Sequence, residues 1–354
     1  MGQAAVFEGP AAALGVGMRT GLNAAFAEAN RAGGVHGRRI ELVGENDGYE
    51  PNASIEAVRK LIEQKQVFAL VGPVGTPTVG AHLPVAKAAG VPVIGPFTGA
   101  VPLRAPAFDN AIHVRASYDQ ETEVMVERLT KDLGYTRIAI LYQDDGFGRA
   151  GHSGIQKALT KRGMTLAAEG TFERNTVAVR TGLLAVRKGD PQAVVIIGPY
   201  KPAAEFIKLA RQIKLKATFV AISFVGATAL AKELGPAGEG VVVTQVVPLP
   251  WDSSIPLVGQ YQAAIKAVDP AAEPEFTSLE GYAVGRATLA ALQRMQGEPS
   301  RAGLLKAFAA GPIDLGGMTL TYGPDDREGS DTVFLTVIDK DGRFRAVDRL
   351  EAAP

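Results

Sequence analysis

The chain has 354 residues, of which 46% are hydrophobic and 21% are charged. This length exceeds one ordinary domain and the composition is that of a folded globular protein, so we expect two lobes with a cleft between them. Lys plus Arg and Asp plus Glu both total 37, a balance that provides no positive field for nucleic acid or an anionic membrane. The absence of cysteine excludes thiol nucleophiles, Cys-ligated zinc and disulfides.

Short apolar strands alternate with helices through the first 95 residues. Met18, Leu22 and Phe26 recur at helical spacing, and Gly33 ends the helix that they predict. The expected segments are, in order, strand 4–7, this helix, strand 39–43, a helix through Ile55 to Ile62, strand 68–71, a helix to Ala89 and strand 92–94. This alternation is typical of a parallel sheet with helices on both faces, so it predicts one α/β lobe.

The same alternation begins again after a loop rich in proline, glycine and alanine at 95–106. The expected segments are helix 120–133, strand 138–142, helix 148–162, a strand near Leu166, a helix near Arg180, strand 193–197, a helix to Gln212, and strands near Phe219 and at 241–243. They predict a second parallel α/β lobe. The pattern is helical again over 255–309, and strands with a turn at 339–342 are expected near the end. This order suggests a chain that crosses between the lobes several times.

The start of the sequence bears on its location. No apolar stretch approaches the run of about 20 residues that crosses a bilayer. A basic n-region followed by an apolar h-region is also missing, because Met1 leads directly into the first expected strand. We therefore expect a chain whose signal peptide has been removed, although a native cytosolic start has the same appearance.

Glycine-rich loops follow several strands, at the edge where parallel sheets bind ligands. In the first loop, 71–78, Pro77 suits an early helical position and Thr76 suits the N-cap. A helix N-terminus has free N–H groups and a partial positive charge, so Thr76 and its neighbouring amides are suited to bind a carboxylate. The alternative is that Thr76 only caps its own helix.

Two further loops occupy related positions. The loop at 94–100 follows the next strand, and its Phe97 either covers an apolar part of a ligand or belongs to the core. The loop at 142–151 has the corresponding place in the second lobe, where Phe147 either forms a wall or packs against its own lobe. Its two aspartates, Asp144 and Asp145, are interpreted as a polar turn.

Motifs of enzymes and cofactor sites are weak. Segment 15–21 reads G-x-G-x-x-x-G, which is not the dinucleotide spacing, and segment 72–78 lacks the Lys-Ser/Thr pair of a P-loop. The four histidines share no ligand spacing, and there is no G-x-S-x-G elbow. We therefore expect no catalytic residue, no metal and no cofactor.

The ordered set of segments resembles the leucine/isoleucine/valine-binding proteins of ABC transporters, along nearly the whole chain. The pieces that carry the resemblance are 29–37 (ANRAGGVHG), 44–48 (GENDG), 91–96 (VPVIGP), 115–118 (RASY), 141–148 (LYQDDGFG) and 280–282 (EGY). The resemblance implies the type I periplasmic binding fold, an α/β architecture of two Rossmann-like lobes with parallel sheets joined by a three-crossover hinge. Lobe 1 is then 1–116 plus 249–329, lobe 2 is 117–248 plus 330–354, and the ligand lies in the cleft between them.

The same resemblance implies site residues. In the family, a Ser or Thr of the first loop and backbone groups of the second bind the carboxylate and ammonium of the ligand, and these positions correspond to Thr76 and to Phe97, Thr98 and Gly99. Other positions correspond to pocket-lining residues or lie close enough to reach the cleft. They are Leu14, Tyr118, Phe147, Tyr200 or its neighbour Lys201, and Tyr282.

The sequence departs from the family at Ser223, near which amino-acid binders commonly carry an acidic residue. A buried ammonium without a counter-charge is unfavourable, so either another acid substitutes or the ligand is not a free amino acid. Glu280 is the first candidate for this acid, followed by Asp144 or Asp145.

The expected function is that of a periplasmic, monomeric binding protein of an ABC importer, which passes a small carboxylate ligand to a membrane permease. A branched-chain or other aliphatic amino acid is the expected ligand, and an aromatic or other non-amino carboxylic acid is the alternative. An alternative from another class is a ligand-sensing receptor domain, although the sequence shows neither an attached membrane helix nor a DNA-binding headpiece.

Overall fold

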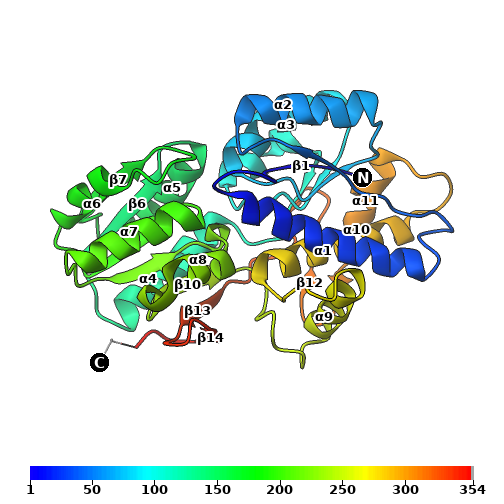
Figure 1. Ribbon diagram of the computed structural model, residues 1–354. Helices are drawn as coiled ribbons and strands as arrows, with labels where there is room; N and C mark the ends of the chain where they lie inside the picture. Colours follow the sequence, from blue (N-terminus) through cyan, green and yellow to red (C-terminus); the bar gives the residue numbers. More distant parts are fainter. Residues whose placement is uncertain (352–354) are drawn as a thin grey trace. The chain divides into compact units, whose positions relative to one another are not determined.

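Two sheets, each in a unit of its own, organise the chain in the computed structural model, which describes residues 1–351 (Figure 1). Unit 1 consists of Met1–Thr98, Pro102–Ala116 and Val247–Thr332. Unit 2 consists of Gly99–Val101, Ser117–Val246 and the segment from Val333 onward. Each unit is thus assembled from segments that are far apart in the sequence.

The sheet of unit 1 is parallel throughout, with the strand order β2-β1-β3-β4-β5. Its strands are β1 (Gly2–Ala5), β2 (Val43–Asn46), β3 (Leu70–Val71), β4 (Val93–Ile94) and β5 (Ala111–Ile112). The helices of this unit are α1 (Ala12–Arg31), α2 (Pro51–Arg59), α3 (Thr76–Ala88), α9 (Pro256–Val268), α10 (Phe276–Arg294) and α11 (Arg301–Phe308). A π-helical turn (Lys60–Gln64) extends α2, and β11 (Ile313–Asp314) pairs antiparallel with β12 (Thr319–Leu320).

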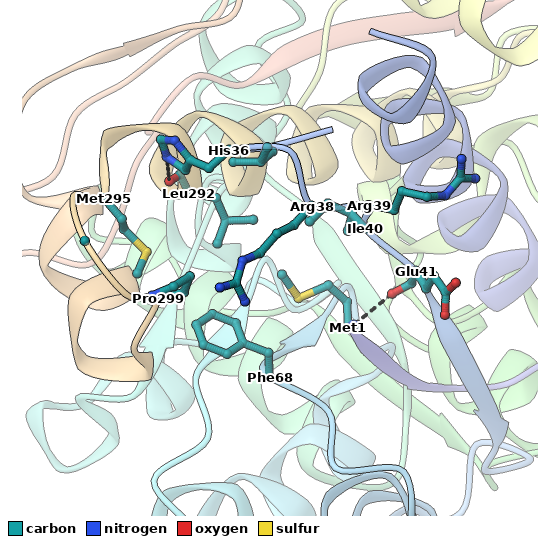
Figure 2. A pocket seen from close by; sticks show the side chains of 12 residues that line it. Met1, His36, Arg38, Arg39, Ile40, Glu41, Phe68, Leu292, Met295 and Pro299 are labelled. Carbon is teal, nitrogen blue, oxygen red and sulfur yellow. Dashed lines mark hydrogen bonds between the residues drawn. The ribbon is translucent and has the colours of Figure 1, made fainter. Parts of the chain in front are cut away.

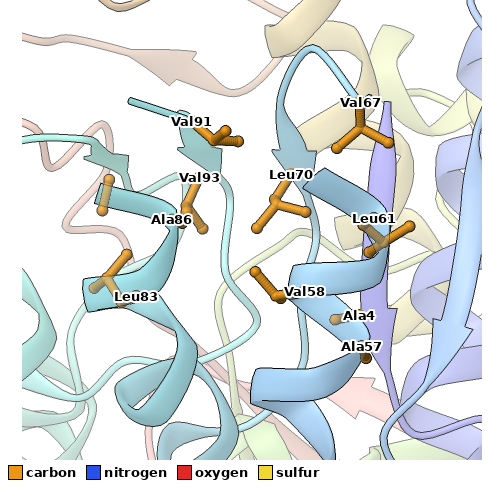
Figure 3. Packing of buried hydrophobic residues seen from close by; sticks show 11 residues of the cluster. Ala4, Ala57, Val58, Leu61, Val67, Leu70, Leu83, Ala86, Val91 and Val93 are labelled. Carbon is orange, nitrogen blue, oxygen red and sulfur yellow. The ribbon is translucent and has the colours of Figure 1, made fainter. Parts of the chain in front are cut away.

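An apolar layer joins this sheet to α2 and α3 (Figure 3). Ala4, Leu70 and Val93 from the strands meet Val58 and Leu83 from the helices, and all five are fully buried. Burial of a Val or Leu side chain stabilises a fold by about 1.5–3 kcal/mol. This layer therefore holds α2 and α3 against the sheet.

Glycines bring α1 and α10 into close contact. A Cβ atom at Gly21 would lie 1.9 Å from the carbonyl oxygen of Ser278, and one at Gly281 would lie 2.3 Å from that of Met18. Both neighbours are backbone atoms, which cannot rotate away. Only glycine fits at these two crossing points.

The sheet of unit 2 has the order β14-β13-β10-β9-β8-β6-β7. Its parallel strands are β6 (Ile138–Gln143), β7 (Ala168–Phe172), β8 (Ala193–Ile197), β9 (Thr218–Ala221) and β10 (Val242–Gln245). The antiparallel hairpin β13 (Phe334–Ile338) and β14 (Phe344–Ala346) extends it next to β10. The helices are α4 (Tyr118–Lys131), α5 (Gly146–Thr160), α6 (Arg180–Arg187), α7 (Tyr200–Gln212) and α8 (Ala227–Leu234).

The predicted alternation of strands and helices is confirmed, including the all-buried strand β8 and the hairpin turn at 339–342. The strand predicted at 39–43 is wrong, because β2 begins only at Val43. Its partner β1 begins at Gly2, which pairs with Val43, so residues 39–42 have no neighbouring strand with which to form a ladder. An apolar pattern alone did not reveal this missing partner.

Candidate functional site

Two hydroxyl groups meet where β3 and β4 end. Thr76 follows β3, Thr98 follows β4, and their Oγ1 atoms lie 2.7 Å apart at hydrogen-bond distance. The loops continue the pairing of the strands, since the N–H of Phe97 donates to the oxygen of Pro73 at 2.7 Å and Val74 bridges to Phe97. We call Thr76 and Thr98 the hydroxyl pair. Two neighbouring parallel strands thus place it at one edge of the sheet, as predicted for their loops.

Thr76 is not the N-cap of α3, which corrects the sequence prediction. The N-cap is Gly75, whose φ of 104° requires glycine, and no side chain caps the helix. Thr76 is the first helical residue and Pro77 follows it, one position later than predicted. Its hydroxyl bonds to Thr98 rather than to the backbone of its own helix, so the interpretation of Thr76 as a simple cap is wrong as well.

Phe97 and Glu280 both contact the buried Arg115. The guanidinium carbon of Arg115 lies 4.7 Å from the centre of the Phe97 ring, a cation–π geometry, and its Nε lies 3.4 Å from Oε1 of Glu280. All three side chains are buried. Glu280 therefore already faces a positive charge of its own chain, and we no longer expect it to bind the ammonium of a ligand.

Tyr282 lies on a different face of α10 from Glu280, because residues two apart on a helix point in different directions. Its ring centre is 5.8 Å from that of Tyr261, and its hydroxyl donates to Glu28 at 2.6 Å. Burial and the neighbouring Glu28 raise the pKa of Tyr282. The role of Tyr282 in lining a pocket together with Phe97 stays a prediction. Leu14, near the start of α1, is fully buried.

In unit 2 three aromatic rings come together at the corresponding sheet edge. The ring centre of Phe147 lies 5.5 Å from that of Tyr118 and 4.5 Å from that of Phe224. We call Tyr118, Phe147 and Phe224 the aromatic cluster. Gly99 is part of its support: its carbonyl accepts from the N–H of Tyr118 at 2.7 Å, and a Cβ atom there would lie 2.6 Å from the Tyr118 ring.

The loop after β6 starts α5 and positions Phe147. Asp145 is the N-cap, and its Oδ1 accepts from the N–H of Phe147 at 2.9 Å and from that of Gly148 at 3.4 Å. This agrees with the interpretation of the aspartates as a polar turn. Tyr200, the first residue of α7, is buried and is the third residue after the end of β8, which places it at the same edge of the sheet.

Sequence reasoning missed Glu121, whose fully buried carboxylate lies beside Ser223. Its oxygens accept from the N–H of Ser223 at 3.0 Å, from the hydroxyl of Ser223 at 2.9 Å and from the hydroxyl of Thr244 at 2.5 Å. Ser223 and Thr244 lie where β9 and β10 end. An acid therefore reaches the position of Ser223 from α4. The available signal was a glutamate on the face of α4 that also carries Thr122 and Met125, which are buried.

A separate cavity of about 230 Å³ lies at the opposite edge of the unit 1 sheet, where β1 and β3 begin (Figure 2). Phe68, Leu292 and Met295 line it, and Arg38 extends toward Phe68 with its guanidinium 3.1 Å from Glu298. The N-terminal amine donates to the oxygen of Glu41 at 2.8 Å beside it. None of the predicted site residues lines this cavity.

Two further features concern metal sites and membranes. Within residues 1–351, no group of three or more His, Asp or Glu side chains is arranged to hold a metal ion. No helix in the described range is long and apolar enough to cross a membrane.

The sequence model of the periplasmic binding protein family matches residues 1–343. The chain belongs to this family. Its members are substrate-binding proteins of the periplasm, not enzymes, and the predicted type I periplasmic binding fold is confirmed.

Individual relatives agree with this assignment. The crystal structure of a possible leucine/isoleucine/valine-binding protein from Rhodopirellula baltica SH 1 is 36% identical, with a TM-score of 0.93 over 98% of this chain and 95% of that one. Leu/Ile/Val-binding protein homolog 7 of Brucella suis is 24% identical over 91% of this chain and 84% of its own length. An ABC-transporter solute-binding protein from R. palustris, solved in complex with benzoate, is 20% identical and has a TM-score of 0.86, covering 98% and 94% of the two chains.

Proposed function

We propose that this protein binds a small hydrophobic carboxylic acid and delivers it to the membrane permease of an ABC importer. The observation that carries the proposal is the hydroxyl pair at the start of α3. A helix N-terminus favours negative charge, and two neighbouring hydroxyl groups add donors for a carboxylate. We further propose that the protein acts in the periplasm and as a monomer.

We propose that aromatic side chains contact the apolar part of the ligand. Phe97 lies one residue from Thr98 in unit 1, and the aromatic cluster lies at the corresponding edge of unit 2. Binding pockets combine a mainly apolar wall with few polar groups, a composition that these residues have.

An aliphatic amino acid of the branched-chain type is the first candidate ligand. The names of the relatives from Rhodopirellula baltica and Brucella suis favour it. Glu121 supports it chemically, because a buried carboxylate beside Ser223 supplies the negative charge that an ammonium needs in a protein interior. We therefore propose Glu121, in place of Glu280 or the two aspartates, as the partner of the ammonium.

An aromatic acid without an ammonium is the second candidate. The relative from R. palustris was solved with benzoate, and the ring-rich edge of unit 2 suits a planar ligand. Both candidates share the carboxylate, so the hydroxyl pair serves either one.

A thermal-shift screen tests the proposal. The panel contains L-leucine, L-isoleucine, L-valine, 4-methylpentanoate and benzoate, with leucinamide as the matched control that lacks a carboxylate. Because a ligand that binds only the folded state raises the melting temperature, at least one acid is expected to do so while leucinamide does not. Equal stabilisation by leucine and leucinamide contradicts the carboxylate proposal.

A further inference from the structure

Tyr49 has a backbone conformation that is unusual for its residue type. Its φ is +64°, in the left-handed region, and its side chain is fully buried. A bulky residue in this region is a genuine outlier that costs about 1–3 kcal/mol, and such strain persists only where surrounding contacts enforce it. The contacts that enforce it here begin at Asp47.

Asp47 fixes the turn that contains Tyr49. Its Oδ1 accepts from the N–H of Tyr49 at 2.9 Å, and its backbone carbonyl accepts from the N–H of Glu50 at 2.9 Å. Its own N–H donates to the carbonyl of Ala5 at 3.0 Å, which ties the turn to the end of β1. Asp47 is itself buried and follows β2 directly.

The ring of Tyr49 lies against Gly75. A Cβ atom at Gly75 would be 2.4 Å from Cε2 of Tyr49 and 2.9 Å from its Cδ2, so the edge of the ring covers the backbone of this residue. Gly75 is the N-cap of α3, and the next residue is Thr76. A direct chain of contacts thus runs from the carboxylate of Asp47, through the turn and ring of Tyr49, to the residue that precedes the hydroxyl pair.

We propose that Asp47 and Tyr49 are positioning residues for ligand binding, which hold Gly75 and therefore Thr76 in the orientation that receives the carboxylate. This inference rests on the proposed function. The strain at Tyr49 has a role in it, since the left-handed turn is what directs the ring onto Gly75. Displacement of the ring frees the start of α3 and weakens the binding of the ligand.

The inference gives ligand affinity a dependence on pH. Burial raises the pKa of Asp47 to about 6. Hydrogen bonds from the Tyr49 N–H and the Ser54 hydroxyl lower this pKa, whereas the nearby charge of Glu50 raises it further. On α3, His82 faces Ser54, but burial lowers its pKa to about 3, so it stays uncharged near pH 6. A neutral carboxyl accepts a hydrogen bond about half as strongly as a carboxylate. Protonation of Asp47 therefore weakens its hold on Tyr49 as the pH falls through about 6.

The test is calorimetric titration of L-leucine, with benzoate as a second probe, at several pH values from about 5 to about 8. Wild type is expected to bind about 3–10 times more weakly at the acid end. Asp47→Asn is neutral at every pH, so its affinity is expected to equal the acid value of wild type and to stay flat. Asp269→Asn is the matched control. Asp269 lies in an exposed turn, and its Oδ1 accepts from the N–H of Ala271 at 2.9 Å, the same distance as in the Asp47–Tyr49 hydrogen bond.

Tyr49 variants test the second step of the contact chain. Tyr49→Phe retains the ring edge and is expected to keep both the affinity and its pH dependence, whereas Tyr49→Leu loses the planar edge and is expected to bind about tenfold more weakly. Melting temperatures are measured alongside, since a purely structural role lowers them and leaves the affinity of the folded fraction unchanged. The inference is overturned if Asp47→Asn has wild-type affinity at all pH values, or if Tyr49→Leu has wild-type affinity. In either case the proposed function is retained if Thr76→Ala still weakens binding. Wild type that binds none of the acids in the thermal-shift panel overturns both the inference and the proposed function.

Discussion

At the scale of single residues, the acid beside Ser223 is the main addition that the structure makes. The sequence shows a serine near the position where an acid is expected, and no pattern of spacing connects position 121 to position 223. Glu121 reaches Ser223 only because α4 packs over the ends of β9 and β10. Tyr49 was missed for a similar reason, since its left-handed conformation depends on a contact with Asp47.

Glu121→Gln tests the assignment of the ammonium partner. The substitution keeps the size of the side chain and removes the charge, so the preference for L-leucine over 4-methylpentanoate is expected to fall from more than about tenfold to less than about threefold. Calorimetric titrations of both ligands give this ratio. Glu123→Gln, on the same helix but in a partly exposed pair with Arg162, is the control. If Glu121→Gln weakens both ligands equally, Glu121 only holds Ser223 and Thr244 in place.

His82 predicts a dependence of stability on pH. Its Nδ1 lies 2.8 Å from the hydroxyl of Ser54, and burial lowers its pKa to about 3. In the unfolded chain the pKa of this histidine is about 6.5, so on acidification the unfolded state binds a proton before the folded state does. The free energy of unfolding is therefore highest above about pH 6.5 and decreases as the pH falls below this value. Between about pH 6.5 and about pH 5 this loss is about 2 kcal/mol.

His82→Gln removes this titration while its amide still reaches Ser54. The difference in unfolding free energy between wild type and variant is expected to shrink by about 2 kcal/mol on acidification over that range, as measured by urea denaturation. The comparison of the two proteins cancels the contribution of Asp47, which has the opposite sign. A difference that does not vary with pH contradicts the account of His82.

At the scale of elements, most strands and helices could be predicted from their apolar patterns, while their ends could not. The strand β8 is apolar and buried at all five positions, so its sequence alone identifies it. The start of α3 is decided by the positive φ of Gly75, which shifted Thr76 from the predicted cap into the helix. The strand predicted at 39–43 failed because a ladder needs a partner that the segment does not have.

The contact between α1 and α10 gives a prediction for glycine. A Cβ atom at Gly21 would lie 1.9 Å from a carbonyl oxygen of α10, so Gly21→Ala forces the helices apart and is expected to destabilise the fold by about 2 kcal/mol or more. Gly259→Ala in α9 is the matched control, because its nearest neighbour is 3.4 Å away. There, alanine is expected to stabilise by about 0.5–1 kcal/mol. Equal effects of the two substitutions on the urea midpoint contradict the close packing of α1 and α10.

At the scale of the whole molecule, the sequence predicts two α/β units and the family to which the chain belongs, and the comparisons confirm the family and the fold. The order of the segments carried this prediction, since each motif alone is loose. The identity of the ligand could not be predicted from the order of the segments. Relatives with the same fold are named for branched-chain amino acids or were solved with benzoate, so the fold alone does not identify the ligand.

The central claim is that the hydroxyl pair binds the carboxylate of the ligand. The most direct measurement is calorimetric titration of the acid with the largest thermal shift into wild type and into Thr76→Ala. Loss of one hydrogen bond to a charged group costs about 1.5–3 kcal/mol, so the variant is expected to bind at least about tenfold more weakly. The melting temperature without ligand is measured alongside, because Thr76→Ala also removes the buried hydrogen bond to Thr98 and is expected to lower it. Equal affinities of the two proteins contradict the claim.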